Sequence, residues 1–224
     1  MFQYTHEWKE RESNKNEMFN TRWPLMSVNG QDQTDAKKYL QARNLSWMIA
    51  ESNGWYVSRN AGDGFLRIVI PAVTTKDGAV YWQARAVSPN VHLRYQSPYG
   101  PRCGALIKVN AYPDETERTQ ELVVVEGPMD ALAVAEQGID AVAIMGMNPG
   151  AEAKAHLATI AHNRHVAIIL DSEPEAHKAA FDLSLYLAGC SKCCSVHVYE
   201  VPKAKDIASM ANNDRVTFLG RLFE

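Results

Sequence analysis

Residues 122–138, "LVVVEGPMDALAVAEQG", combine two patterns that decide the fold. The apolar run at 122–125 predicts a buried strand, which ends at Glu126. Pro128 suits the first position of a helix, where its missing N–H is harmless. The residues after it are apolar at helical spacing, so a strand passes directly into a helix. This is the building unit of a parallel sheet.

The same alternation continues to the end of the chain. Apolar segments of strand type alternate with longer segments of helical type, and their ranges are 121–127, 128–138, 141–146, 151–162, 165–171, 174–189 and 195–202. Continuous apolar strands between helices predict a parallel sheet that is covered on both faces. We therefore expect an α/β domain over residues 119–224, a parallel sheet flanked by helices.

A smaller mixed α+β subdomain is expected over residues 34–118. Its first part, 34–54, reads as two short helices, the first with Thr34 or Asp35 as N-cap. Three runs rich in β-branched and aromatic residues, 65–71, 79–87 and 105–110, then predict an antiparallel sheet. Residues 1–33 have no clear periodicity, and we interpret them as a leader that is weakly ordered or packs only through Trp8, Phe19 and Trp23.

Acidic side chains follow three of the predicted strands. They are Glu126 and Asp130 after the first, Asp171 and Glu173 after the second, and Asp206, preceded by Lys205, after the last. In open α/β sheets, ligands bind outside the carboxyl ends of the strands, so we expect these groups to meet at one edge. Clustered carboxylates repel one another unless a cation lies among them. Oxygen ligands of this kind suit Mg²⁺ or Mn²⁺, which bind through a few carboxylates and substrate phosphates.

Composition limits the class of protein. The chain has 224 residues, 46% of them hydrophobic, and a formal charge of −3. No apolar run approaches the ~20 residues of a membrane span, and no signal peptide is visible, so we expect a cytoplasmic protein, in the host cytoplasm if a phage encodes it. Seven basic residues face only two acidic ones in 54–108, which suits binding to phosphates. Cys190, Cys193 and Cys194 lack the second ligand pair of a zinc site, and we interpret them as small buried residues.

These motifs resemble a known family. "EGPMDALA" (126–133), "LDSEPEAHKAA" (170–180) and "PKAKD" (202–206) resemble the successive motifs of the TOPRIM fold, which primases, topoisomerases and some nucleases share. Upstream, "YLQARNLS", "RIVIPAV", "YWQARAV" and "LRYQSP" resemble, in order and spacing, the N-terminal half of the DnaG-type primase catalytic core. The likeness covers about residues 35–210 and is closest to phage or plasmid types without a zinc-binding module.

The resemblance implies roles for individual residues. The metal-binding acids of the family fall on Glu126, Asp130, Asp171, Glu173 and Asp206, of which Glu126, Asp130 and Asp171 would be catalytic. Its residues that bind template or nucleotide fall on Arg67, Arg85 and Arg94, with Lys108 and Lys205 added. The second motif departs from Asp-x-Asp, because Glu173 takes its last position, and Ser209 replaces a further acid of the third motif.

The resemblance implies a DNA primase, a DNA-directed RNA polymerase that makes short RNA primers on single-stranded DNA from ribonucleoside triphosphates. Its partners would be the template, the nucleotides and a replicative helicase, with no membrane. No G-x-x-x-x-G-K-[ST] loop of a helicase is present in the chain. Two alternatives stay open: a TOPRIM nuclease, and a non-catalytic single-stranded DNA-binding or regulatory module derived from a primase.

Overall fold

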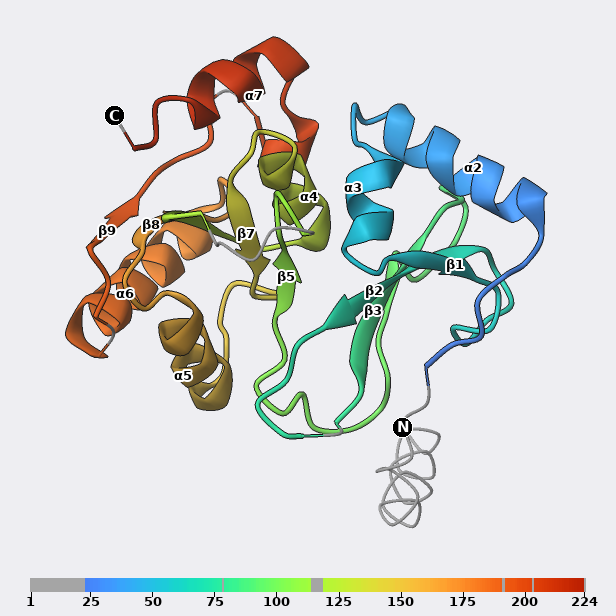
Figure 1. Cartoon of the computed structure of the whole chain (residues 1–224), viewed down its shortest axis with the longest axis horizontal. Helices are drawn as coiled ribbons and strands as arrows, with labels where there is room; N and C mark the ends of the chain where they lie inside the picture. The colour runs from blue at the N-terminus through green and yellow to red at the C-terminus, as the bar shows by residue number, and fades with distance from the viewer. Residues whose placement is uncertain (1–22, 78, 114–118, 191, 203, 224) are drawn as a thin grey trace, which may run out of the picture.

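The computed structural model describes residues 23–77, 79–113, 119–190, 192–202 and 204–223. Most of the predicted leader, with Trp8 and Phe19, lies outside them. Two units stand side by side in Figure 1, a larger one built from the C-terminal half and a smaller one built from the N-terminal half.

The larger unit is built on a five-stranded sheet. Its strand order is β5-β7-β6-β8-β9, with β7, β6, β8 and β9 mutually parallel and β5 antiparallel at one edge. The strands are β5 (Ile107–Val109), β6 (Glu121–Val125), β7 (Asp140–Ala143), β8 (His165–Ile169) and β9 (Ser195–Val198). Residues 122–125 at the sheet centre are fully buried, as the apolar run predicts.

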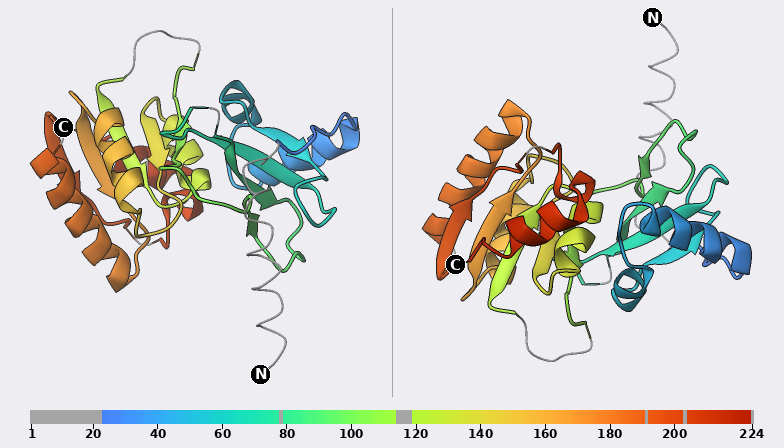
Figure 2. Two further views of the ribbon diagram at one scale, coloured as in Figure 1. Left: turned by 90° about the horizontal axis from the view of Figure 1, so that it is seen from below. Right: turned by 90° about the horizontal axis from the view of Figure 1, so that it is seen from above.

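Helices cover both faces of this sheet (Figure 2). One face packs against α5 (Ala151–Ile160) and α6 (Pro174–Cys190). The other face packs against α4 (Pro128–Ala135), the short 3-10 helix η2 (Ile207–Ser209) and α7 (Asn212–Leu219). The prediction of a parallel sheet flanked by helices is confirmed.

The smaller unit contains an antiparallel sheet with two helices. Its strands pair in the order β1-β2-β3-β4, each antiparallel to the next. The elements are α2 (Gly30–Gln41), α3 (Trp47–Ser52), β1 (Tyr56–Ser58), β2 (Arg67–Ala72), β3 (Tyr81–Ala86) and β4 (Tyr95–Gln96).

Two predictions about this unit are wrong. The run at 105–110 adds no strand to the antiparallel sheet: Leu106 forms an isolated antiparallel bridge with Val73 after β2, but strand β5 pairs with β7 in the larger unit, Lys108 opposite Val142. Helix α2 begins before the predicted boundary at 33/34, because Asn29 is its N-cap and the Asn29 side chain accepts from the Gln31 N–H. Residues 23–29 also belong to the folded unit, since the Ser27 N–H donates to the Val57 carbonyl at 2.7 Å.

One continuous apolar core joins the two units. It contains Leu40, Trp55 and Ile68 from the smaller unit together with Val125 and Leu132 from the larger one. Helix α3 packs on α4, and β2 lies next to β5. The relative position of the two units is therefore fixed by buried apolar contacts rather than by a linker.

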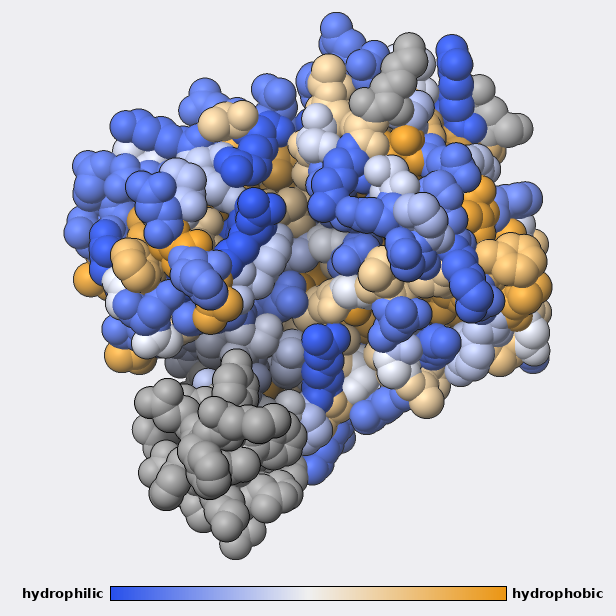
Figure 3. All heavy atoms as spheres, turned by 180° about the vertical axis from the view of Figure 1, so that it is seen from behind, coloured by the Kyte–Doolittle hydropathy of each residue, from blue (hydrophilic) through white to orange (hydrophobic). Residues whose placement is uncertain are grey.

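The surface is mainly hydrophilic. Figure 3 shows one face, on which polar residues dominate and apolar side chains form small separate groups. Within the described part of the chain, no helix combines the length and apolar character needed to cross a membrane. The cysteines differ from the prediction: Cys190 and Cys194 are exposed and Cys193 is half-buried, because they lie at and beyond the end of α6.

Candidate functional site at the acidic sheet edge

Glu126 and Asp171 lie at the same edge of the sheet. Strands β6 and β8 are parallel neighbours in which Val125 pairs with Ile169, and each acid follows the end of its strand. Both side chains are half-buried. Glu173 follows two residues after Asp171, at the start of α6, and is exposed. The strand pairing thus brings Glu126, Asp171 and Glu173 to one edge of the sheet, as the sequence predicts.

Asp130 is held in the first turn of α4. Gly127 is the N-cap and Pro128 occupies the beginning of the helix, as predicted. The Asp130 side chain is 8% exposed, and its Oδ1 accepts from the Ala208 N–H at 2.9 Å. A Cβ atom on Gly127 would lie 3.0 Å from Asp130 Oδ2. Glycine at the N-cap therefore leaves room for the carboxylate beside it.

Asp206 uses its carboxylate as a helix cap. Its Oδ1 accepts from the Ser209 N–H at 2.7 Å, and its own N–H donates to Ser209 Oγ at 3.2 Å. This reciprocal pair is a capping box at the start of η2. Ser209, which replaces a further acid of the motif, thus fixes the loop that carries Asp206.

The acids at this edge are short of counter-charge. Burial and, after it, the Asp171 and Glu173 carboxylates raise the pKa of Glu126. Burial, followed by the Asp206 carboxylate, raises the pKa of Asp130 to about 7. The pKa of Asp171 is raised by burial and by Asp206 and Glu173. All five predicted acids therefore take part in one mutually repelling group, to which we refer as the acidic edge.

Lys205 supplies a positive charge at the acidic edge. Its Nζ lies 3.2 Å from Glu173 Oε1 and 3.9 Å from Asp171 Oδ2. Its backbone carbonyl accepts from the Ser172 N–H at 3.1 Å, which ties the Lys205 loop to the loop after β8. The Lys205 ammonium thus contacts acids of the site. Its predicted role, binding to nucleic acid or nucleotide, stays a prediction.

The residues of the acidic edge fit a divalent cation that keeps open positions. Glu126 Oε2 is buried and has no hydrogen-bond partner, and the Lys205 ammonium already stands where a cation is favoured. Among the described residues, no three acidic, histidine or cysteine side chains form a ready-made cage. Mg²⁺ commonly binds through one or two carboxylates, with waters and phosphates as further ligands, so an open set of this kind suits it.

Arg67 does not reach any solvent-exposed groove. Its side chain is 0% exposed, and its guanidinium binds the Asp63 carboxylate at 2.6 Å and the carbonyls of Ala84 and Leu93 at 3.0 and 2.9 Å. The prediction that Arg67 contacts nucleic acid is therefore wrong. The guanidinium instead holds β2, β3 and the segment before β4 together.

Arg85 lies in a stack of aromatic and guanidinium groups. Its Nε donates to the Tyr39 hydroxyl at 2.6 Å, and its Cζ is 4.8 Å from the centre of the Tyr95 ring. Burial raises the pKa of Tyr95, and Asp130 is among the charges that act on it, so the stack borders the acidic edge. Arg43 Cζ lies 3.9 Å from the Tyr39 ring centre. Sequence reasoning missed Tyr39 and Arg43, although their spacing of four along a helix was a usable signal.

The two other predicted basic residues lie elsewhere on the two units. Arg94 is exposed immediately before β4, and Lys108 is half-buried in the edge strand β5. Their binding roles stay predictions.

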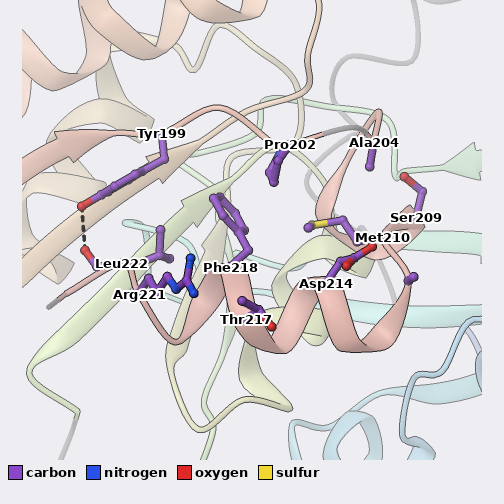
Figure 4. A pocket seen from close by; sticks show the side chains of 11 residues that line it. Tyr199, Pro202, Ala204, Ser209, Met210, Asp214, Thr217, Phe218, Arg221 and Leu222 are labelled. Carbon is purple, nitrogen blue, oxygen red and sulfur yellow. Dashed lines mark hydrogen bonds between the residues drawn. The ribbon is translucent and has the colours of Figure 1, made fainter.

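A cavity of about 630 Å³ is lined by residues of the segment 199–211 and of α7 with the residues after it. Figure 4 shows Phe218 of α7 directed toward Pro202, and the Tyr199 hydroxyl donating to the Leu222 carbonyl at 2.6 Å. Ser209 contributes both to this cavity and to the cap made by Asp206. The cavity is lined by none of the five acids, so it is separate from the acidic edge.

Residues 123–211 match the family model described as Toprim-like. No curated protein sequence matches the chain. Among solved structures, the Aquifex aeolicus primase, comprising zinc-binding and RNA polymerase domains, has a TM-score of 0.62 at 18% identity, with 87% of this chain and 55% of that chain covered. The present chain therefore spans about half of that primase chain.

Two bacteriophage T7 structures are also similar. The primase fragment of the T7 primase-helicase protein has a TM-score of 0.58 at 17% identity, covering 95% of this chain and 83% of that chain. A second match, with a TM-score of 0.53 at 18% identity, covers 82% of this chain and 87% of a chain from a larger T7 complex. In that complex the lagging-strand DNA polymerase interacts with primase domains of two gp4 subunits bound to an RNA/DNA hybrid and dTTP. These matches confirm the predicted fold class and the resemblance to primase cores at the level of the fold.

Proposed function

We propose that this chain is the catalytic core of a DNA primase, which joins ribonucleotides into short RNA primers on a single-stranded DNA template. One observation carries the proposal: carboxylates from three separate segments repel one another at one sheet edge, where burial and this repulsion raise the pKa values of Glu126, Asp130 and Asp171. The shared fold with primase fragments supports this choice among the activities that use a TOPRIM edge.

We assign Asp171 and Glu173, the two acids that contact the Lys205 ammonium, to holding Mg²⁺ or Mn²⁺, with Glu126, Asp130 and Asp206 beside them. When bound, the ion would supply charge stabilisation for the triphosphate and lower the pKa of the attacking 3′-hydroxyl. The Glu126 carboxylate at the end of β6 would accept that proton, and pyrophosphate would leave as the new phosphodiester bond forms.

The smaller unit would bind the template. The Arg85, Tyr39 and Tyr95 stack offers a cation and aromatic faces next to the acidic edge, which is the chemistry that single-stranded nucleic acids bind. Arg94 and Lys108 would add contacts to phosphates. By analogy with the T7 primase-helicase, we expect a replicative helicase as partner, and a cytoplasmic location.

A priming assay tests the proposal. The full chain is incubated with single-stranded DNA, labelled ribonucleotides and either Mg²⁺, Mn²⁺ or a chelator. We expect short labelled RNA products that need both the template and the ion. Products that form equally well without template would contradict the proposal.

The same mixtures separate the alternatives. A nuclease would cut end-labelled DNA in Mn²⁺ whether or not ribonucleotides are present. A non-catalytic module would bind the DNA and give neither product. The second alternative is favoured by one feature, since the Asp206 carboxylate is already engaged as a helix cap.

A further inference from the structure

The Lys205 ammonium occupies the place of a cation at the acidic edge. It lies within ion-pair distance of both Glu173 and Asp171, two acids that come from the loop after β8. Each of these carboxylates is close to other acids, so a positive charge between them lowers the repulsion. An ammonium group and a divalent ion would therefore compete for the same pair of carboxylates.

The Lys205 side chain can leave this place without a change in the backbone. Its main chain is held by the hydrogen bond from the Ser172 N–H to its carbonyl, and the Asp206–Ser209 capping box holds the residues that follow. The side chain itself is 64% exposed, and a lysine side chain has several rotatable bonds. An exchange would thus need a rotation of one exposed side chain and no loop movement.

We propose that Lys205 is an internal counter-ion that holds the Asp171–Glu173 pair in the metal-free protein and gives it up to a divalent cation. The displaced ammonium then stands at the edge of the site, where it is available to the phosphates of an incoming nucleotide. The proposal rests on the proposed function in one respect: it needs a divalent cation at these carboxylates.

Mn²⁺ binding by the full chain, followed through the electron paramagnetic resonance signal of the free ion, tests the exchange. In Lys205→Met the competing cation is gone, so Mn²⁺ should bind about three- to tenfold more tightly than in the wild type. Lys205→Arg keeps a cation and should stay within about twofold of the wild type. Equal or weaker binding by Lys205→Met would overturn the proposal.

Lys178→Met is the matched control. Lys178 is an exposed lysine on α6 that pairs with Asp182 at 3.1 Å, so this variant loses the same charge away from the acidic edge. Its Mn²⁺ affinity should equal that of the wild type. A gain as large as that of Lys205→Met would reduce the effect to net charge and overturn the proposal.

A second measurement follows Lys205 itself in the wild-type protein. In the wild type, the ε-methylene NMR signal of Lys205, assigned by its absence from Lys205→Arg, should shift when Mg²⁺ is added. An unmoved signal at saturating Mg²⁺ would overturn the exchange. If neither the wild type nor any variant binds Mn²⁺, both the exchange and the proposed metal site are wrong. If Lys205→Met binds Mn²⁺ more tightly but no longer makes primers, the exchange still holds.

Discussion

The smaller unit and the acidic edge of the larger unit differ in how their charged residues are paired. In the smaller unit, buried charge is paired: the Arg59 side chain lowers the pKa of Asp32, and Arg67 lowers that of Asp63. At the acidic edge, Glu126, Asp130 and Asp171 have raised pKa values, caused first by burial and then by neighbouring carboxylates. Charged residues of the smaller unit thus have partners of opposite charge. The carboxylates of the acidic edge have too few, which is typical of a site that binds a cation.

The largest expected effect is loss of activity in Asp171→Ala. Under the proposed function, priming should fall at least about a thousandfold, because a ligand of the ion is lost and that ion contributes several kcal/mol. The thermal midpoint of the metal-free protein should not fall, since a repelling carboxylate is removed. Priming and thermal unfolding are measured on the same samples.

Asp182→Ala is the control for this variant, because Asp182 is an exposed acid on α6. It should keep both activity and stability. Primer synthesis that survives in Asp171→Ala would remove Asp171 from the site.

The pH dependence of stability should show the same contrast. Asp130 has a pKa of about 7 when folded against 3.8 as its ordinary value, so between pH 4 and 7 the folded state keeps a proton that the unfolded state has lost. The metal-free protein should therefore lose about 4 kcal/mol of stability as pH rises through this window. Urea unfolding at a series of pH values measures it.

Asp130→Asn should remove most of that slope and keep the hydrogen bond from the Ala208 N–H. The paired Asp32 and Asp63 act in the opposite direction, and only below about pH 4, because their pKa values are lowered. Stability that increases from pH 4 to 7 in the wild type would contradict the raised pKa of Asp130.

Arg67→Met tests the paired side of the comparison. Removing a fully buried guanidinium leaves Asp63 and two carbonyls without their donor, so the free energy of unfolding should fall by about 3 kcal/mol. Lys178→Met is the contrasting variant: Lys178 and its partner Asp182 are both exposed, and the loss of this pair should cost less than about 0.5 kcal/mol. Equal costs in urea unfolding would show that burial does not decide the role of Arg67.

Arg85→Ala should act on binding. Single-stranded DNA affinity should drop about tenfold, and its dependence on salt should become shallower, because one cation next to aromatic rings is lost. Fluorescence anisotropy at several salt concentrations measures both. Unchanged affinity at every salt concentration would remove Arg85 from the template path.

Apart from the control and contrasting variants, Gly127→Ala should have the smallest effect of these variants, a small loss of stability. The new Cβ would stand 3.0 Å from Asp130 Oδ2, and alanine is a poor N-cap, so about 1 kcal/mol of stability should be lost. Gly150 is also an N-cap, of α5, with nothing within 4 Å of an added Cβ. A larger loss in Gly127→Ala than in Gly150→Ala isolates the contact with Asp130.

Local patterns predicted the larger unit well and the smaller one less well. The alternation after residue 121 gave the sheet, because a strand, its turn and its helix are adjacent in sequence. Strand β5 was assigned to the wrong sheet because its partner β7 begins more than thirty residues later along the chain. No local pattern carries that pairing.

The acidic edge was predictable in outline, since parallel strands bring their ends to one side. The position of Lys205 among the acids was not, because it depends on how two loops meet. The burial of Arg67 had a signal that was missed: Asp63 lies four residues before it, and residues 68–70 are an unbroken apolar run, which is unlike a strand with one face in water.

The apolar core that runs through both units restricts how the protein can be divided. A cut in the segment between β5 and β6 would leave Trp55 and Ile68 bare on one fragment and Val125 and Leu132 bare on the other. Each fragment would then expose a hydrophobic surface to water, and we expect it to aggregate instead of folding. Loops around the acidic edge can therefore be exchanged, but the two units have to be kept together because they fold cooperatively around one core.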